Sequence, residues 1–109
     1  MDLNDYQTAA LQTAVYPNRG SNFAYPALGL AGEAGEVADK LKKVIRDNDN
    51  VLTDAVRDAV AKEIGDVLWY VSVLANELNY DLNTIAQSNL DKLASRQQRG
   101  VLTGSGDNR

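Results

Sequence analysis

Apolar residues recur every three or four positions through most of the chain, and this helical period is the strongest constraint on its fold. No segment shows the alternation of apolar and polar residues that is typical of a half-buried strand. We expect helices over residues 5–15, 26–47, 54–78 and 83–99, with Asn83 as the cap of the last. The sequence predicts an all-α domain over residues 1–99 and a flexible C-terminal tail over residues 100–109.

The two long central segments each carry an apolar stripe at helical spacing. In residues 26–47 the stripe consists of Leu30, Ala34, Val37, Leu41 and Val44. In residues 54–78 it consists of Val56, Val60, Ile64 or Val67, Val71, Leu74 and Leu78. Two such stripes favour a four-helix bundle in which they face each other. Because so small a bundle leaves large faces uncovered, we also expect homo-oligomerisation, to a homodimer or a homotetramer.

Two absences in the composition exclude several kinds of chemistry. The chain of 109 residues has no cysteine and no histidine, which excludes thiolate nucleophiles, disulfides, zinc–cysteine sites and histidine bases. Any bound metal must therefore have oxygen ligands, as Mg²⁺, Mn²⁺ and Ca²⁺ prefer. The net charge of −4 disfavours nucleic acid as a partner. A polar N-terminus and the lack of a long apolar run predict a cytoplasmic protein without a membrane span.

Two matched acidic pairs lie on the two long segments. Glu33 and Glu36 form one pair, Glu63 and Asp66 the other, and both have the i, i+3 spacing that puts their carboxylates on one helix face. Each pair flanks its apolar stripe at a similar offset, so packing of the stripes would bring the pairs together. Two carboxylates about 4 Å apart repel by about 4 kcal/mol at an effective dielectric near 20, and one or two Mg²⁺ ions would offset this.

The alternative is that these acids belong to an ordinary solvated helix surface. Three of the chain's four glutamates lie in the pairs, although aspartates outnumber glutamates eleven to four. This distribution favours a metal site with Glu33, Glu36, Glu63 and Asp66 as ligands. Gly29, Gly32 and Gly35 recur nearby, which indicates close approach of a helix or a substrate, unless the helix begins only near Gly32.

Two stretches that contain these pairs resemble a known family. The runs A-L-G-L-A-G-E-A-G-E-V-A-D at 27–39 and K-E-I-G-D-V-L-W-Y at 62–70 are similar to the MazG-like nucleoside triphosphate pyrophosphohydrolases. The resemblance extends over most of residues 3–100. It implies Mg²⁺-dependent hydrolysis of canonical or modified (d)NTPs to the monophosphate and pyrophosphate, with Mn²⁺ as a possible substitute. It also implies that the four acids are Mg²⁺ ligands and that one of these glutamates helps to deprotonate the water that attacks the α-phosphorus.

Further residues are candidates for holding the nucleotide. Asn89, Lys92, Arg96 and Arg99 step by three, four and three along one helix face, in a segment similar to the family's C-terminal N…K…R element. Such a face would bind phosphates, or would simply be a solvated basic face. Tyr70, one turn beyond Asp66, is a further candidate for phosphate contact. The candidates for base contact are Tyr6, Gln7, Tyr16, Phe23 and Tyr25, with packing in the core as the alternative for the aromatic residues.

Two other functions remain open at this point. One is hydrolysis of phosphoribosyl-ATP, and the run at 27–39 favours the MazG-like branch over it. The other is a helical assembly or regulatory module that binds Mg²⁺ without catalysis, which the complete acidic quartet disfavours.

Overall fold

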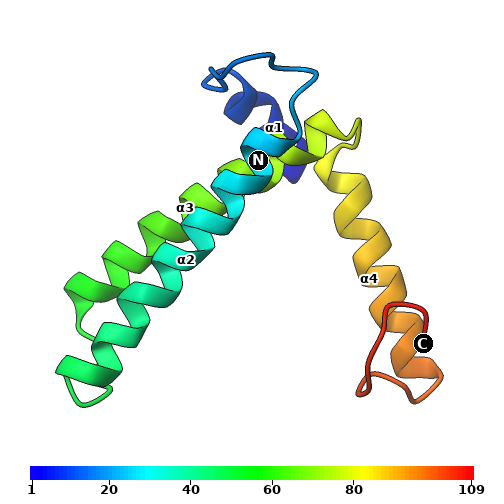
Figure 1. The fold of residues 1–109 in the computed structure, drawn as a ribbon. Helices are drawn as coiled ribbons and strands as arrows, with labels where there is room; N and C mark the ends of the chain where they lie inside the picture. Colours follow the sequence, from blue (N-terminus) through cyan, green and yellow to red (C-terminus); the bar gives the residue numbers. More distant parts are fainter.

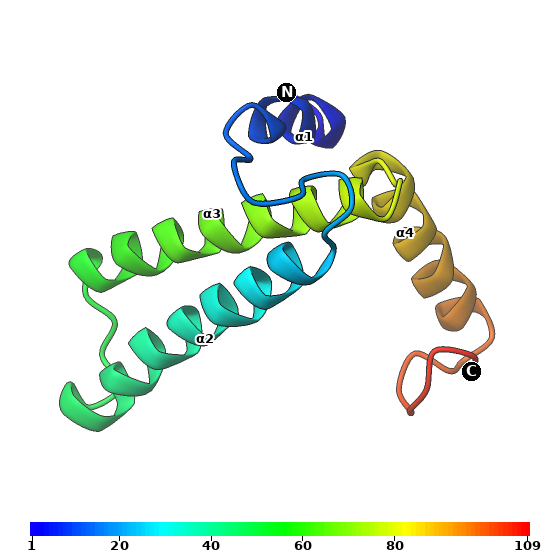
Figure 2. The same ribbon diagram turned by 45° about the horizontal axis from the view of Figure 1, so that its top comes forward.

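The computed structural model describes all residues 1–109 and is entirely helical, which confirms the all-α prediction. The helices are α1 (Leu3–Leu11), α2 (Ala24–Asp47), α3 (Asp54–Glu77) and α4 (Leu82–Gln98). Figure 1 shows two diverging arms, one formed by α2 and α3 side by side and the other by α4. Helix α1 packs at the apex against both α3 and α4, and Figure 2 shows it lying above α3.

Side chains at the helix N-termini explain where three of the helices begin. Asp2 and Asp5 form a capping box at α1, and Thr53 Oγ1 accepts the Val56 N–H at α3. At α4 the cap is Asp81, whose carboxylate accepts the Thr84 N–H, so our expectation of Asn83 was wrong.

Asn83 instead exchanges hydrogen bonds with Asn4. Its N–H donates to Asn4 Oδ1 at 2.9 Å, and the Asn4 N–H donates to Asn83 Oδ1 at 3.3 Å. These two bonds tie the first turn of α1 to the first turn of α4.

Two boundaries differ from the expected ones near the N-terminus. Helix α1 ends at Leu11 rather than near residue 15, because the Thr13 and Ala14 N–H groups bond to carbonyls three residues back in a tighter turn. Helix α2 already begins at Ala24, with Pro26 in its first turn, where a proline removes no helical hydrogen bond. The alternative start near Gly32 is therefore wrong.

The long helices meet along a line that is rotated from the expected apolar stripes. Val44 and Val60 are buried between α2 and α3, as expected. Leu41 and Ile64, from the same stripes, remain 38% and 55% exposed. Half-buried Glu33 and Glu63 occupy positions in the contact line instead. The stripes thus face each other only in part. The stripe residues outside the contact form an uncovered apolar face on the hairpin made by α2 and α3.

The single chain buries unusually little of itself. Only 11 of its 109 residues are buried, and its radius of gyration of 16.9 Å exceeds the value of about 13 Å for a compact domain of this length. Its accessible surface of 7543 Å² likewise exceeds the roughly 5,900 Å² of a typical monomer of this mass. The two-armed shape is the cause, because α4 leaves the hairpin instead of completing a bundle with it (Figure 1).

The C-terminal segment folds back on α4. Arg96 Nη2 donates to the Asp107 carbonyl at 2.9 Å, and Arg109 donates to the Val101 and Leu102 carbonyls at 3.0 and 2.9 Å. The flexibility that we expect for residues 100–109 stays a prediction.

Candidate metal centre and its surroundings

Three of the four predicted acids come together between α2 and α3. Glu33, Glu63 and Asp66 each place a carboxylate oxygen within 4.8 Å of the others. We call these three residues the acidic cluster. Glu33 and Glu63 are half-buried because their positions lie in the contact line of the hairpin, whereas Asp66 is exposed. Glu36 is exposed, lies outside this group and contributes its charge to the surroundings of Glu33.

The electrostatics of the acidic cluster show that it lacks positive charge. The pKa of Glu33 is raised, first by hydrogen bonding with the Glu63 carboxyl, then by burial and by the charges of Asp66, Glu63 and Glu36. Lys40 offsets part of this negative charge, because its Nζ lies 3.6 Å from Glu63 Oε1. Converging half-buried carboxylate oxygens are the donor set that Mg²⁺ or Mn²⁺ prefers, so these residues fit such an ion.

Two tyrosines border the acidic cluster. Burial raises the pKa of Tyr70, with smaller contributions from Tyr25, Glu33 and Asp66, and burial together with the Asp66 charge raises the pKa of Tyr6. The ring of Tyr70 also packs on Gly29, where any Cβ would overlap it. Gly29 is therefore required for close approach, as expected, although an aromatic side chain approaches rather than a helix backbone or a substrate.

The other two glycines of that series have open surroundings. A Cβ at Gly32 or Gly35 would meet no atom of the chain within 4 Å. Nothing in the single chain explains these two glycines.

The segment between α1 and α2 is fixed by a residue that sequence reasoning missed. Glu77 accepts hydrogen bonds from the Tyr16 hydroxyl, from the Gly20 N–H at 2.8 Å and from the Asn22 N–H at 3.3 Å. These bonds lower the pKa of Glu77, whereas burial and Glu77 itself raise the pKa of Tyr16 to about 12. The sequence gives only a weak indication of this role, which is that Glu77 is the one glutamate outside the acidic pairs.

The candidates for base contact have different surroundings. Tyr16 and Tyr25 stack with their ring centroids 4.8 Å apart and their planes 8° from parallel, and Phe23 is 65% exposed. Gln7 is buried and donates both amide hydrogens, to the Ser72 and Tyr80 carbonyls, while its oxygen accepts the Leu82 N–H. Gln7 therefore has a structural role in linking α1 to the turn between α3 and α4.

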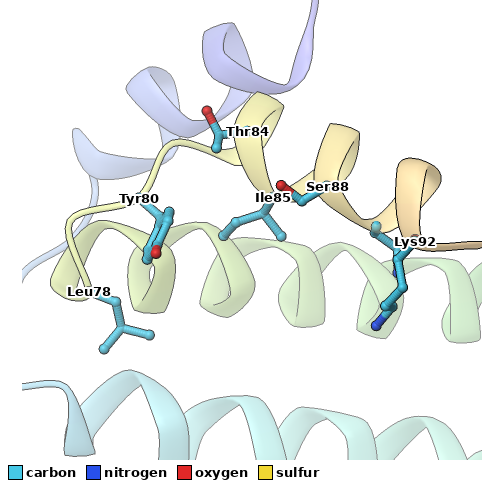
Figure 3. Close-up of a pocket in the computed structure, with 7 residues that line it drawn as sticks. Leu78, Tyr80, Thr84, Ile85, Ser88 and Lys92 are labelled. Atoms are coloured by element: carbon cyan, nitrogen blue, oxygen red, sulfur yellow. The ribbon is translucent and has the colours of Figure 1, made fainter. Parts of the chain in front are cut away.

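The candidates for phosphate contact divide between two places. Tyr70 borders the acidic cluster, whereas Asn89, Lys92 and Arg96 lie on the other arm. Asn89 and Lys92 line a cavity of about 520 Å³ where α4 leaves the end of α3 (Figure 3). Leu78, also in its lining, lies about 18 Å beyond Asp66 along the helix axis.

Arg96 is covered by the C-terminal segment. It is 4% exposed, its Nη2 contacts the Asp107 carbonyl and carboxylate, and its Nε has no hydrogen-bond partner. Lys92 Nζ reaches the same Asp107 carboxylate at 3.4 Å. Within one chain, then, the basic face of α4 contacts the tail and does not meet the acidic cluster.

Comparisons with known proteins identify the family. None of the four helices has both the length and the apolar composition needed to cross a bilayer. The chain is 51% identical, over the full length of both sequences, to the Gene 37 protein of Mycobacterium phage L5. No solved structure matches it significantly. The family model for the MazG nucleotide pyrophosphohydrolase domain matches residues 25–101, from the start of α2 to the end of α4. The chain therefore belongs to the MazG nucleotide pyrophosphohydrolase family.

Proposed function

We propose that this protein is a Mg²⁺-dependent hydrolase that converts canonical or modified (d)NTPs to the monophosphate and pyrophosphate in the cytoplasm. The observation that carries the proposal is the convergence of the acidic cluster from two separate sequence motifs. Membership of the MazG family supports the same reaction class.

The chain's own residues would divide the work as follows. Glu33, Glu63 and Asp66 would hold the ion, and Glu36 would complete the set as a fourth ligand. When bound, Mg²⁺ supplies positive charge that lowers the pKa of water and stabilises charge on the phosphates. One of the glutamates accepts the proton of the water that attacks the α-phosphorus, and the hydroxyl of Tyr70 donates to a phosphate oxygen.

Hydrolysis of a panel of nucleotides tests this function directly. The protein, supplied with Mg²⁺ and each common NTP and dNTP in turn, is expected to release pyrophosphate from at least one of them. Phosphoribosyl-ATP is included in the panel, since its preferential hydrolysis would replace the proposed substrate class. Absence of turnover on every nucleotide would instead support a non-catalytic Mg²⁺-binding module.

Mg²⁺ is expected to stabilise the fold. Because the ion would bind only the assembled acidic cluster, about tenfold excess over its Kd should raise the Tm by several degrees. Differential scanning fluorimetry with and without millimolar Mg²⁺ measures the shift. The Glu33→Gln variant should lose most of it and Asp58→Asn, an exposed carboxylate of α3, should keep it. A Tm that does not respond to Mg²⁺ in the wild-type protein would contradict a preformed metal site.

We also propose that the protein is a homodimer or homotetramer. The single chain exposes about 1,600 Å² more surface than a typical monomer of its mass, which is enough for a substantial interface. Large exposed apolar side chains lie on all three long helices, α2, α3 and α4. They include Leu28, Leu41, Ile45, Ile64, Leu68, Ile85, Leu90 and Leu93.

Assembly would also complete the phosphate site. Asn89 and Lys92 lie on the arm that diverges from the hairpin, so α4 of the same chain does not bring them to the acidic cluster (Figure 1). We propose that α4 of a partner subunit supplies them. Each site would then combine the acidic cluster of one chain with the basic face of another.

Mixing two inactive variants tests this shared site. When Glu63→Gln and Lys92→Ala subunits are unfolded together and refolded, random dimers should regain about a quarter of wild-type activity, because half are mixed and each mixed dimer has one intact site. Glu63→Gln mixed with Asp66→Asn is the matched control and should stay inactive, since both changes damage the same side. If subunit exchange is verified and the first mixture stays inactive, the shared site is wrong.

A further inference from the structure

Glu77 is a carboxylate that the proposed reaction does not use, yet it is the most heavily bonded acid outside the acidic cluster. It lies at the end of α3, and its two oxygens accept three hydrogen bonds from the segment between α1 and α2. Two of the three donors are backbone N–H groups, so these bonds fix the path of the main chain itself. Asn22, whose N–H is one of them, in turn accepts the Tyr25 N–H at 3.1 Å in the first turn of α2.

The segment that Glu77 fixes carries Tyr16, the first of three neighbouring tyrosines. Tyr16, whose hydroxyl binds Glu77, stacks face to face on Tyr25. Tyr70 packs on Gly29, which lies one turn after Tyr25 on the same face of α2. Burial, with smaller contributions from Tyr25, Glu33 and Asp66, raises the pKa of Tyr70. We call Tyr16, Tyr25 and Tyr70 the aromatic shelf. It runs from the acidic cluster to the contact with Glu77.

The position of the shelf suits the nucleoside end of a nucleotide. If the acidic cluster holds the phosphates, the sugar and base extend away from it, and flat aromatic faces are the surfaces on which a base stacks. Tyr25 is 42% exposed, and the neighbouring Phe23 is more exposed still, so ring surface is free for such contact. Nothing but Glu77 bonds the Tyr16 hydroxyl, so the outer end of the shelf depends on this carboxylate.

We propose that Glu77 is a positioning residue that holds the aromatic shelf in place for the nucleobase. The proposal rests on the function proposed above and adds a determinant of substrate affinity to it. Glu77 acts through Tyr16 and the main chain of the segment, and it touches neither the phosphates nor the metal. Its loss should therefore weaken nucleotide binding without slowing the chemical step.

The Glu77→Gln variant tests this. A glutamine has the same shape, but its NH₂ group would face at least one N–H or O–H donor that now bonds a carboxylate oxygen. Stacking of a base on an aromatic ring contributes about 1–3 kcal/mol, so partial loss should raise KM for the best nucleotide about tenfold. The kcat should stay within about twofold of wild type. The inhibition constant of inorganic tripolyphosphate, which has no base, should not change.

Tyr16→Phe is the second variant, because it keeps the ring and removes only the hydroxyl that donates to Glu77. It should raise KM in the same direction, and the double variant should raise it no further than the larger single change. Asp58→Asn, which removes an exposed carboxylate on the same helix, is the control and should leave KM unchanged.

The outcomes separate this proposal from the proposed function. Wild-type turnover of a nucleotide with unchanged KM in both variants would refute the role of Glu77 alone. An equal loss of tripolyphosphate binding, or a fall in kcat without a rise in KM, would also refute it. Absence of turnover by the wild-type protein would refute the function itself.

Discussion

Glu63→Gln is expected to lower kcat for nucleotide hydrolysis by about a thousandfold while the helical content stays unchanged. Glu63 lies in the contact line of α2 and α3 and is half-buried between Glu33 and Lys40. Its substitution removes a negative ligand from the centre of the acidic cluster. Because the same substitution also removes repulsion, the Tm of the metal-free protein should be unchanged or slightly higher.

Steady-state kinetics and circular dichroism measure these two effects. Asp58→Asn, on the same helix and outside the acidic cluster, serves as control and should keep both activity and fold. Glu36→Gln then tests the fourth ligand, and a loss as large as that of Glu63→Gln would support it. Full activity of Glu63→Gln would refute the metal centre.

Ile64→Asp is expected to convert the proposed oligomer to a monomer of 11.8 kDa. Ile64 is 55% exposed in the single chain and belongs to the uncovered apolar face of the hairpin. An aspartate there costs little in an isolated chain but would place an unpaired charge in an interface, at a cost of several kcal/mol. Light scattering coupled to size exclusion measures the mass, and circular dichroism checks that the helices persist.

Two further variants complete this experiment. Ile45→Asp, on the other helix of the hairpin, should also reduce the mass, since Ile45 is 66% exposed. Val51→Asp changes an exposed apolar residue in the connection between α2 and α3 and should leave the mass unchanged. A wild-type protein that already runs as a monomer would overturn the proposed assembly.

The helices themselves could be predicted from local sequence because their determinants are local. Periodicity gave α2, α3 and α4 to within a few residues, and Thr53 caps α3 as its position indicated. Where two neighbouring residues were both good caps, as with Asp81 and Asn83, local chemistry did not distinguish them. In the structure Asp81 is the cap, and Asn83 instead bonds to Asn4, which lies 79 positions away.

The way the helices pack was less predictable. An apolar stripe defines a face about a third of a helix wide, but it does not specify which edge of that face meets a neighbour first. The hairpin uses the edge that includes Glu33 and Glu63, so Leu41 and Ile64 are left outside. This rotation brings three of the paired acids together and leaves Glu36 apart.

Contacts between distant residues could not be predicted at all. The bond between Tyr16 and Glu77 spans 61 positions, and the bonds from Gln7 to Ser72 and Tyr80 span 65 and 73. In the sequence, Gln7 is one amide beside a tyrosine, and a base contact was as reasonable as a structural one. Only the packing of α1 on α3 shows that both of its amide hydrogens are already used.

The polar contacts of Gln7 and Asn4 at the apex have a thermodynamic consequence for assembly. Because hydrogen bonds are directional, these contacts fix the angle between the two arms. Apolar contacts alone have no such directional preference and would fix the angle less well. A subunit whose arms are already held open at a fixed angle gives up less conformational entropy when a second one docks. In the proposed assembly, the fixed apex would therefore favour association, and loosening it would weaken association without altering any atom at the interface between subunits.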